Sequence, residues 1–150
     1  MGQSLHKITL HLVFSTKHRE PFIAPPMQPR LYAYMGAVAT DHDSTLLAAG
    51  GMPDHVHLLL ALKPIARPAD VVQNIKAHSS RWMKVTFPEC PTFTWQSGYG
   101  IFAVSSSGID DVKAYIADQP RHHQQRTFQD ELRTILRLNG MDWDERYIWE

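Results

Sequence analysis

The segment 50-GGMPDHVHLLLAL-62 constrains the fold more than any other part of the chain, because it predicts a turn followed by a long apolar strand. This strand begins with His55 and His57, which are separated only by Val56. Strand side chains alternate between the two faces of a sheet, so both imidazoles project from one face, about 7 Å apart along the chain. Such a pair can bind one metal ion, and it can equally be a hydrogen-bonded pair on a half-exposed sheet.

Apolar periodicity and the positions of proline and glycine predict the other elements. Besides residues 55–62, we expect strands at 6–15, 44–50 and 101–106, and helices at 27–42, 69–87, 109–119 and 127–138. Pro68 and Asp70 suit the beginning of the second helix, whereas Pro120 is expected to end the third. The order β-α-β-β-α-β-α-α favours an α+β fold, an antiparallel sheet with helices packed mainly on one face. That layout is RRM-like or ferredoxin-like.

The composition favours one domain and limits the available chemistry. The 150 residues are 43% hydrophobic, enough for one core, so residues 1–150 are expected to form a single domain. Cys90 is the only cysteine, which excludes an intrachain disulfide and a zinc site built from thiolates. No apolar run approaches the roughly 18–20 residues of a membrane span, and the start MGQSLHK lacks an apolar signal region. We therefore expect a cytoplasmic protein without a membrane partner.

The charges balance overall, at 15 basic and 15 acidic residues, but their distribution is uneven. Residues 63–86 and 1–30 are both locally basic, and they could form a phosphate-binding surface or remain two solvated faces. The candidate DNA contacts in these segments are Lys17, Arg19, Lys76, Ser79, Ser80, Arg81 and Lys84. Trp95, Tyr99 and Phe102 could stack on unpaired bases or belong to the core.

A tyrosine and a glutamine are placed four residues apart on the helix predicted at 109–119. Tyr115 and Gln119 therefore share one helix face. Tyr115 is either an ordinary core aromatic or a nucleophile toward a phosphodiester, and Gln119 could then supply an oxygen to a metal ion. Pro120 disfavours helical geometry at Gln119, in which case His122 or His123 could replace it.

Two other histidine chemistries fit the segment poorly. A histidine-triad nucleotide site needs a third histidine at the position of Leu59. A structural zinc site would be left half empty by two histidines without cysteines. A metal-dependent hydrolase that activates water on a nucleotide remains open.

Several blocks together resemble the single-tyrosine HUH transposases of the insertion-sequence 200/605 family, of the TnpA type. They are, in order, "HLVFSTKHREPF", "MPDHVHLLL", "IKAHSSRWMKVTFPE", "WQSGYGIFAVS" and "VKAYIADQ". The resemblance covers about residues 6–119, which would form the core, and leaves a C-terminal helical tail at about 120–150. In that tail, "HHQQRTFQDELR" and "DERYIW" are similar to one branch of the family.

This resemblance implies an RRM-like homodimer that cleaves and rejoins single-stranded DNA at hairpin-marked element ends. It makes Tyr115 the nucleophile, which leaves a 5′-phosphotyrosine and a free 3′-hydroxyl without ATP. His55, His57 and Gln119 would be the ligands of Mg²⁺ or Mn²⁺. In the family the tyrosine helix can serve the partner subunit's histidines. Two related roles stay open, a hairpin-binding module that no longer cuts and an enzyme that processes palindromes without moving an element.

Overall fold

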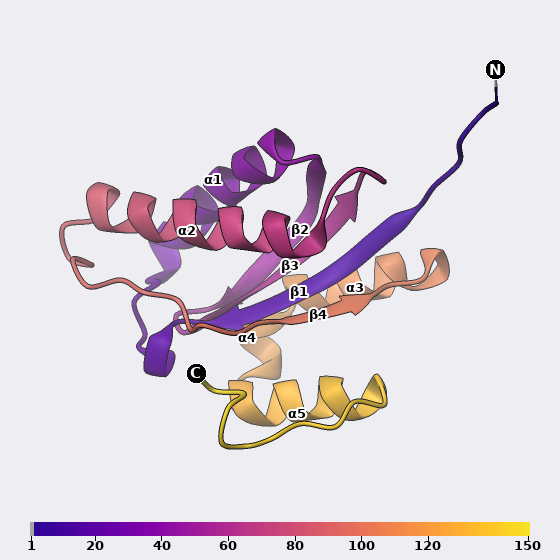
Figure 1. Cartoon of the computed structure of the whole chain (residues 1–150). Helices are drawn as coiled ribbons and strands as arrows, with labels where there is room; N and C mark the ends of the chain where they lie inside the picture. The colour runs from indigo at the N-terminus through magenta and orange to yellow at the C-terminus, as the bar shows by residue number, and fades with distance from the viewer. Residues whose placement is uncertain (1) are drawn as a thin grey trace.

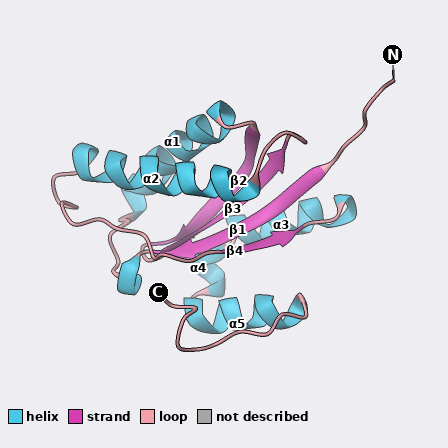
Figure 2. Ribbon diagram, in the orientation of Figure 1, coloured by secondary structure: helices cyan, strands magenta, loops and turns pink. Residues whose placement is uncertain are grey.

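One four-stranded antiparallel sheet organises the protein in a computed structural model that describes residues 2–150. The strand order is β2-β3-β1-β4, so β1 and β3 are central (Figures 1 and 2). The strands are β1 (Ile8–Ser15), β2 (Ser44–Met52), β3 (His55–Leu62) and β4 (Gly100–Ala103). This order, with one helix in each of the two crossovers, is the ferredoxin-like arrangement that the sequence predicts.

The two long helices, α1 (Gln28–Asp41) and α2 (Pro68–Thr86), pack together on one face of the sheet (Figure 1). Alternate residues of the central strands point into this layer and are buried, among them Leu12, Phe14, Val56, Leu58 and Leu60. The α+β prediction, with helices mainly on one face, is therefore confirmed.

The opposite face of the sheet is covered by the C-terminal third of the chain (Figure 1). It carries three shorter helices, α3 (Ile109–Ala117), α4 (Gln119–His122) and α5 (Phe128–Leu138). A smaller apolar cluster joins α5 to this face through Val13, Phe102, Phe128, Leu132 and Leu136. His55 and His57 project into this second layer, so the helical tail covers the histidine face.

A glycine allows α3 to approach the sheet closely. Gly50 on β2 lies opposite His57 on β3, and a Cβ added at Gly50 would overlap the backbone carbonyl oxygen of Ile116. Because the obstacle is backbone, it could not move aside as a flexible side chain would. Gly50 thus lets α3 place Tyr115 beside the histidine strand.

Several predicted element ends differ from those observed, and the differences at β4 and α3 bear on the site. β4 ends at Ala103 rather than 106, because the chain turns into a short 3-10 segment, Ser106–Gly108, before α3. Pro120 does end a helix: α3 stops at Ala117, and α4 begins at Gln119 with Pro120 in its first turn, where no amide hydrogen is needed. No helix within residues 2–150 is long and apolar enough to cross a membrane.

Candidate active site

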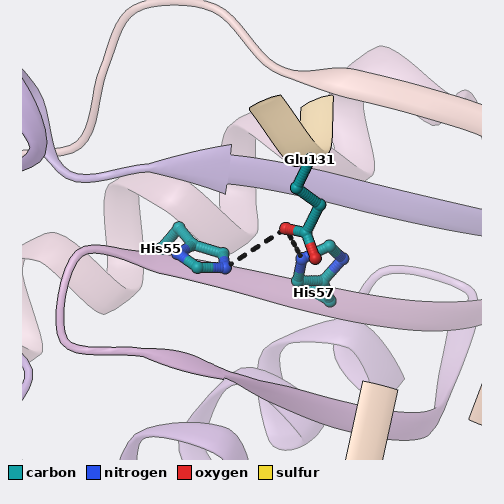
Figure 3. A group of neighbouring side chains, drawn as sticks. All are labelled: His55, His57 and Glu131. Atoms are coloured by element: carbon teal, nitrogen blue, oxygen red, sulfur yellow. Dashed lines mark hydrogen bonds and ion pairs between the residues drawn. The ribbon is translucent and has the colours of Figure 1, made fainter. Parts of the chain in front are cut away.

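The two histidines at the start of β3 form the centre of the site together with a carboxylate from α5 (Figure 3). His55, His57 and Glu131 are all 0% exposed, and each offers one ligand atom within 4.8 Å of the others. His57 Nε2 donates to Glu131 Oε1 at 2.8 Å, and His55 Nε2 lies 3.4 Å from the same oxygen. Two imidazoles and a carboxylate so close together can hold one divalent metal ion.

The other nitrogen of each imidazole is held by a second partner. His55 Nδ1 donates to Asp54 Oδ1 at 2.7 Å. Because His57 donates through Nε2, its Nδ1 accepts from His11 Nε2, 2.8 Å away. These outer contacts fix both rings with Nε2 facing the carboxylate, as second partners do in histidine metal sites.

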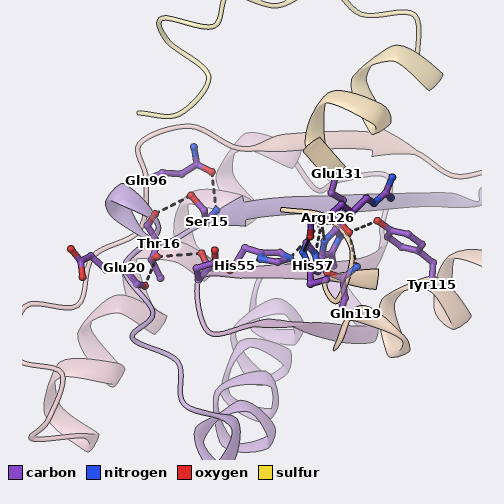
Figure 4. Close-up of polar contacts among 12 residues, drawn as sticks. Ser15, Thr16, Glu20, His55, His57, Gln96, Tyr115, Gln119, Arg126 and Glu131 are labelled. Carbon is purple, nitrogen blue, oxygen red and sulfur yellow. Dashed lines mark hydrogen bonds and ion pairs between the residues drawn. The ribbon is translucent and has the colours of Figure 1, made fainter. Parts of the chain in front are cut away.

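Tyr115 reaches the same centre from α3. Its hydroxyl donates to Glu131 Oε2 (Figure 4). The ring lies 5.7 Å from the His57 ring, between centroids, and stacks on His122 at 4.5 Å. Tyr115 is only half-buried, so its hydroxyl lies where the buried ligands meet a more open region.

Gln119 also reaches the site, although Pro120 separates it from α3. Its fully buried side chain accepts from His55 Nε2 at 2.9 Å and donates to Glu131 Oε2 at 2.9 Å. His123 joins the same cluster, with Nε2 3.1 Å from Gln119 Oε1 and 3.2 Å from Glu131 Oε1. Of the two histidines offered as alternatives to Gln119, His123 lies beside Gln119 in the cluster, whereas His122 stacks on the tyrosine ring.

Burial and the neighbouring carboxylates set the charges of the three histidines. Desolvation lowers the pKa of His55, but hydrogen bonds and charge from Asp54 and Glu131 outweigh it and raise the pKa to about 9. Desolvation dominates at His57 and lowers its pKa despite Glu131. The pKa of His11 falls to about 3 through burial and the neighbouring His57. Of these three histidines, His55 is therefore the one that is charged at neutral pH.

The same forces hold the tyrosine protonated in this arrangement. Desolvation raises the pKa of Tyr115, as do its hydrogen bond to Glu131 and the negative charge there, while the nearby polar groups of Arg126 and Gln119 lower it less. Burial alone would raise the pKa of Glu131, but hydrogen bonds from His123, His55 and His57 lower it far below its usual range. A cation in the site would oppose the effect of the negative charge of Glu131 on the pKa of Tyr115.

Two members of the cluster, Glu131 and His11, were not predicted from the sequence. Glu131 lies within the apolar stripe of α5, between Phe128 and Leu132, and a carboxylate on a buried helix face was the available signal. His11 interrupts an alternating strand whose apolar residues, Leu10 and Leu12, face the main core. That alternation puts His11 on the same face as His57.

α2 packs on the face of the sheet opposite α5 (Figure 1). Because the histidines contact Glu131 of α5, the predicted DNA contacts of α2 lie on the other face of the sheet from them. Ser79 is fully buried and accepts a hydrogen bond from the Trp95 indole at 3.0 Å, so its predicted contact with DNA is wrong. The Lys76 ammonium donates to the carbonyl oxygens of Gln96, Ser97 and Gly98, and desolvation lowers its pKa to about 8. Ser80 is half-buried, whereas Arg81 and Lys84 are exposed.

The other predicted nucleic-acid contacts divide in a similar way. Lys17 and Arg19 are exposed on a 3-10 turn that follows β1, and the residue before them, Thr16, donates its amide to the Asp54 carbonyl at 2.8 Å. This turn therefore lies beside the histidine strand. Trp95 and Phe102 are buried core aromatics, which leaves Tyr99, at 43% exposed, as the one predicted stacking residue on the surface.

The chain is similar to known transposases in sequence and in structure. Residues 4–119 match the family described as transposase IS200 like. ISDra2 transposase TnpA of Deinococcus radiodurans is 27% identical over 120 residues, which cover 77% of this chain and 86% of that protein. A crystal structure described as a transposase from Deinococcus radiodurans R1 superposes with a TM-score of 0.64 at 30% identity, over 79% of this chain and 96% of that one.

A second solved structure shares the fold at lower identity. A REP-associated tyrosine transposase bound to a REP hairpin superposes with a TM-score of 0.60 at 16% identity, over 82% of this chain and 74% of that one. The family match spans well over half of the chain, and it includes both histidines, the tyrosine and the glutamine of the cluster. The chain belongs to the IS200-like transposase family.

Proposed function

We propose that this transposase cuts and rejoins single-stranded DNA through a covalent bond to Tyr115, at a site that also holds a divalent metal ion. One observation carries the proposal: a tyrosine hydroxyl, two imidazole nitrogens and an amide converge on one carboxylate, Glu131, in a buried cluster. A tyrosine that served only as a core aromatic would not need its hydroxyl to share a carboxylate with two oriented histidines.

The donor set fits a divalent ion. His55 and His57 would supply Nε2, and the Gln119 amide and the Glu131 carboxylate would supply oxygens. Imidazole favours softer metals while carboxylate and amide oxygens favour Mg²⁺ and Mn²⁺, so we expect Mn²⁺ to bind more tightly than Mg²⁺. When bound, the ion would polarise a phosphate oxygen and favour negative charge on the attacked group.

The residues of this chain would then carry out an exchange of phosphodiester bonds. The Tyr115 oxygen attacks the phosphorus, a P–O bond to tyrosine forms, and the P–O3′ bond of the strand breaks. Glu131 accepts a hydrogen bond from the Tyr115 hydroxyl and so orients it, the hydroxyl proton leaves to solvent, and the departing 3′ oxygen takes a proton from water. A later attack by a 3′-hydroxyl reverses these bonds and joins new ends, so no ATP is needed.

We propose hairpin-forming single strands as the substrate. The family supports a DNA substrate, and the solved neighbour bound to a REP hairpin supports a folded single strand. The same neighbour keeps open a role in processing repeated palindromes, which would use the same chemistry. We also propose a homodimer; since one chain brings Tyr115 and His57 to a single carboxylate, each subunit would assemble its own site.

Covalent trapping tests the proposal. Labelled hairpin oligonucleotides from the flanks of the gene are incubated with the protein in Mn²⁺ or in EDTA and separated on denaturing gels. We expect a Mn²⁺-dependent protein–DNA adduct that is lost in Tyr115→Phe and His57→Ala. Hairpin binding without an adduct would indicate a module that no longer cuts, and cleavage that survives Tyr115→Phe would indicate a metal-dependent hydrolase.

A further inference from the structure

Two grooves adjoin at the edge of the site. The larger, about 620 Å³, lies between the turn after β1, the β2–β3 turn and residues 123–130, and Asp54 and His123 form part of its wall. The smaller, about 340 Å³, is lined by Arg121, His122, Gln124, Gln125 and Arg126. Arg126 lines both grooves, so they meet at this side chain.

Arg126 extends from the turn between α4 and α5 toward the nucleophile. Its carbonyl oxygen accepts from His123 Nδ1 at 2.9 Å, which fixes the turn against the metal-site cluster. Its half-buried side chain lies near enough to the Tyr115 hydroxyl to lower the pKa of that tyrosine, and Figure 4 shows it in the group around Tyr115 and Glu131. A guanidinium at this point lies where a phosphate attacked by Tyr115 would carry its negative charge.

The groove wall presents uncompensated positive charge. Across the chain, several basic residues pair with carboxylates, namely Lys63, Arg67, Arg121, Arg133 and Arg146. Within residues 2–150, neither Arg19 nor Arg126 has a carboxylate oxygen within the 4.0 Å of an ion pair. The two acids in the larger groove are already engaged, Asp54 by His55 and Asp130 by Arg133. Two free guanidinium groups in one groove are suited to phosphates.

Arg19 is held at this groove by an unfavourable backbone conformation. His18 and Arg19 are consecutive non-glycine residues with φ angles of 57° and 56°. Thr16 secures the turn, because its hydroxyl donates to the Glu20 carbonyl at 2.7 Å and its amide donates to the Asp54 carbonyl. Backbone strain of this kind persists where the surrounding structure imposes it, commonly at functional sites.

We propose that the two grooves form one track for the phosphodiester backbone of a single DNA strand, with Arg126 on the phosphate attacked by Tyr115 and Arg19 on a neighbouring phosphate. This track rests on the proposed function and adds the side chains that position the strand. Arg126 acts on the reacting phosphate itself, whereas Arg19 sets the register of the strand. Gln124 and Gln125 offer uncharged hydrogen-bonding groups along the same path.

Binding of chemically altered strands tests the track independently of cleavage. A hairpin oligonucleotide with a single-stranded tail is titrated in EDTA, with the phosphates of the tail replaced one at a time by neutral methylphosphonates. We expect Arg126→Ala and Arg19→Ala each to weaken binding about tenfold and to reduce the salt slope by about one. A methylphosphonate at the cut position should weaken DNA binding by the wild type but should not weaken binding by Arg126→Ala any further. For Arg19→Ala, the methylphosphonate that causes no further loss of binding should be at a different, neighbouring position.

Controls separate the track from a loss of structure. Arg67→Ala removes an exposed arginine at the opposite end of β3, so its affinity and salt slope should equal those of the wild type. Arg126→Lys should restore the salt slope while forming the adduct more slowly, because lysine lacks the planar fork of arginine. The track would be overturned if Arg126→Ala and Arg19→Ala bound DNA as Arg67→Ala does. It would also be overturned if the loss of affinity from each methylphosphonate simply added to the loss from each arginine substitution.

The trapping assay distinguishes this failure from failure of the proposed function. If the wild type forms the adduct but the arginine substitutions and the methylphosphonates affect binding independently, the track is overturned and the proposed function stands. Coupling without any wild-type adduct would support the track and contradict covalent catalysis.

Discussion

Glu131 is the residue at which the contacts of the site meet. A carboxylate with no exposed surface would be strongly destabilising unless other groups compensated its charge. Here it accepts hydrogen bonds from His57, Tyr115 and Gln119, and charged His55 lies within 3.4 Å. A divalent ion in the site would bind to these same carboxylate oxygens of Glu131.

At this scale we expect Glu131→Gln to weaken Mn²⁺ binding. Loss of a ligand charge should lower the affinity about tenfold or more, by analogy with the losses seen for supporting residues of metal sites. Isothermal titration calorimetry measures it, with Glu145→Gln as the control because Glu145 lies on the exposed side of the tail. Unchanged affinity in Glu131→Gln would remove the carboxylate from the ligand set.

The raised pKa of His55 predicts a pH dependence of stability in the metal-free protein. The charged imidazole stabilises the fold fully below its ordinary pKa of 6.5, and this contribution is lost as the pH rises through about 9. The shift corresponds to a stabilisation on the order of 3 kcal/mol. Urea denaturation in EDTA at pH 6.5 and 9 measures this loss, which should be smaller in Asp54→Asn. An Asp54→Asn protein with the wild-type pH dependence would refute the assignment.

At the scale of elements, features set by neighbouring residues could be predicted from the sequence, whereas features set by contacts between distant residues could not. The apolar periodicity of α2 and the alternation of β3 depend on neighbouring residues, and both elements lie within two residues of their predicted bounds. The shared face of His55 and His57 follows from the same alternation. Glu131 and His57 meet across 74 residues, through the packing of α5 on the sheet, which no local pattern encodes. For the same reason the break at Pro120 was predictable, but the position of Gln119 after it was not.

The close approach of α3 to β2 makes Gly50 a sensitive position. Gly50→Ala should push α3 away from the sheet, lower the free energy of unfolding by about 1–3 kcal/mol and displace Tyr115 from Glu131. Denaturation and the Tyr115 adduct rate measure these effects. Gly36→Ala is the matched control, because a Cβ there meets Leu46 Cδ2 at an ordinary 3.5 Å. Equal behaviour of the two variants would show that α3 does not depend on Gly50.

α5 covers the histidines, so entry of a metal ion should require it to move. Leu132→Ala removes a buried anchor of α5 and should lower the free energy of unfolding by about 2–5 kcal/mol. We expect faster Mn²⁺ uptake, measured by stopped-flow mixing. Leu138→Ala, at the exposed end of the same helix, is the control. If Mn²⁺ entered Leu132→Ala no faster than the wild type, α5 would not limit access.

At the scale of the whole molecule, the sheet divides the main core from the candidate site. One face packs α1 and α2 into the main core, and the C-terminal helices lie on the other face (Figure 1). The second face carries the histidines, the tyrosine and the tail that supplies Glu131 and Arg126. This division explains how a family fold can keep its core while the C-terminal segment adds groups to the site. The exposed Arg81 and Lys84 of α2 lie on the core side and remain proposed contacts for DNA that extends beyond the site.

The most direct test of the account identifies the atom that becomes covalently bonded to DNA. The Mn²⁺-dependent adduct would be digested with protease and nuclease and then sequenced by mass spectrometry. We predict a nucleotide joined through its 5′ phosphate to the peptide that contains Tyr115, with a free 3′-hydroxyl on the released strand. A nucleotide on a histidine or on another tyrosine, or a 3′-phosphate linkage, would contradict the central claim.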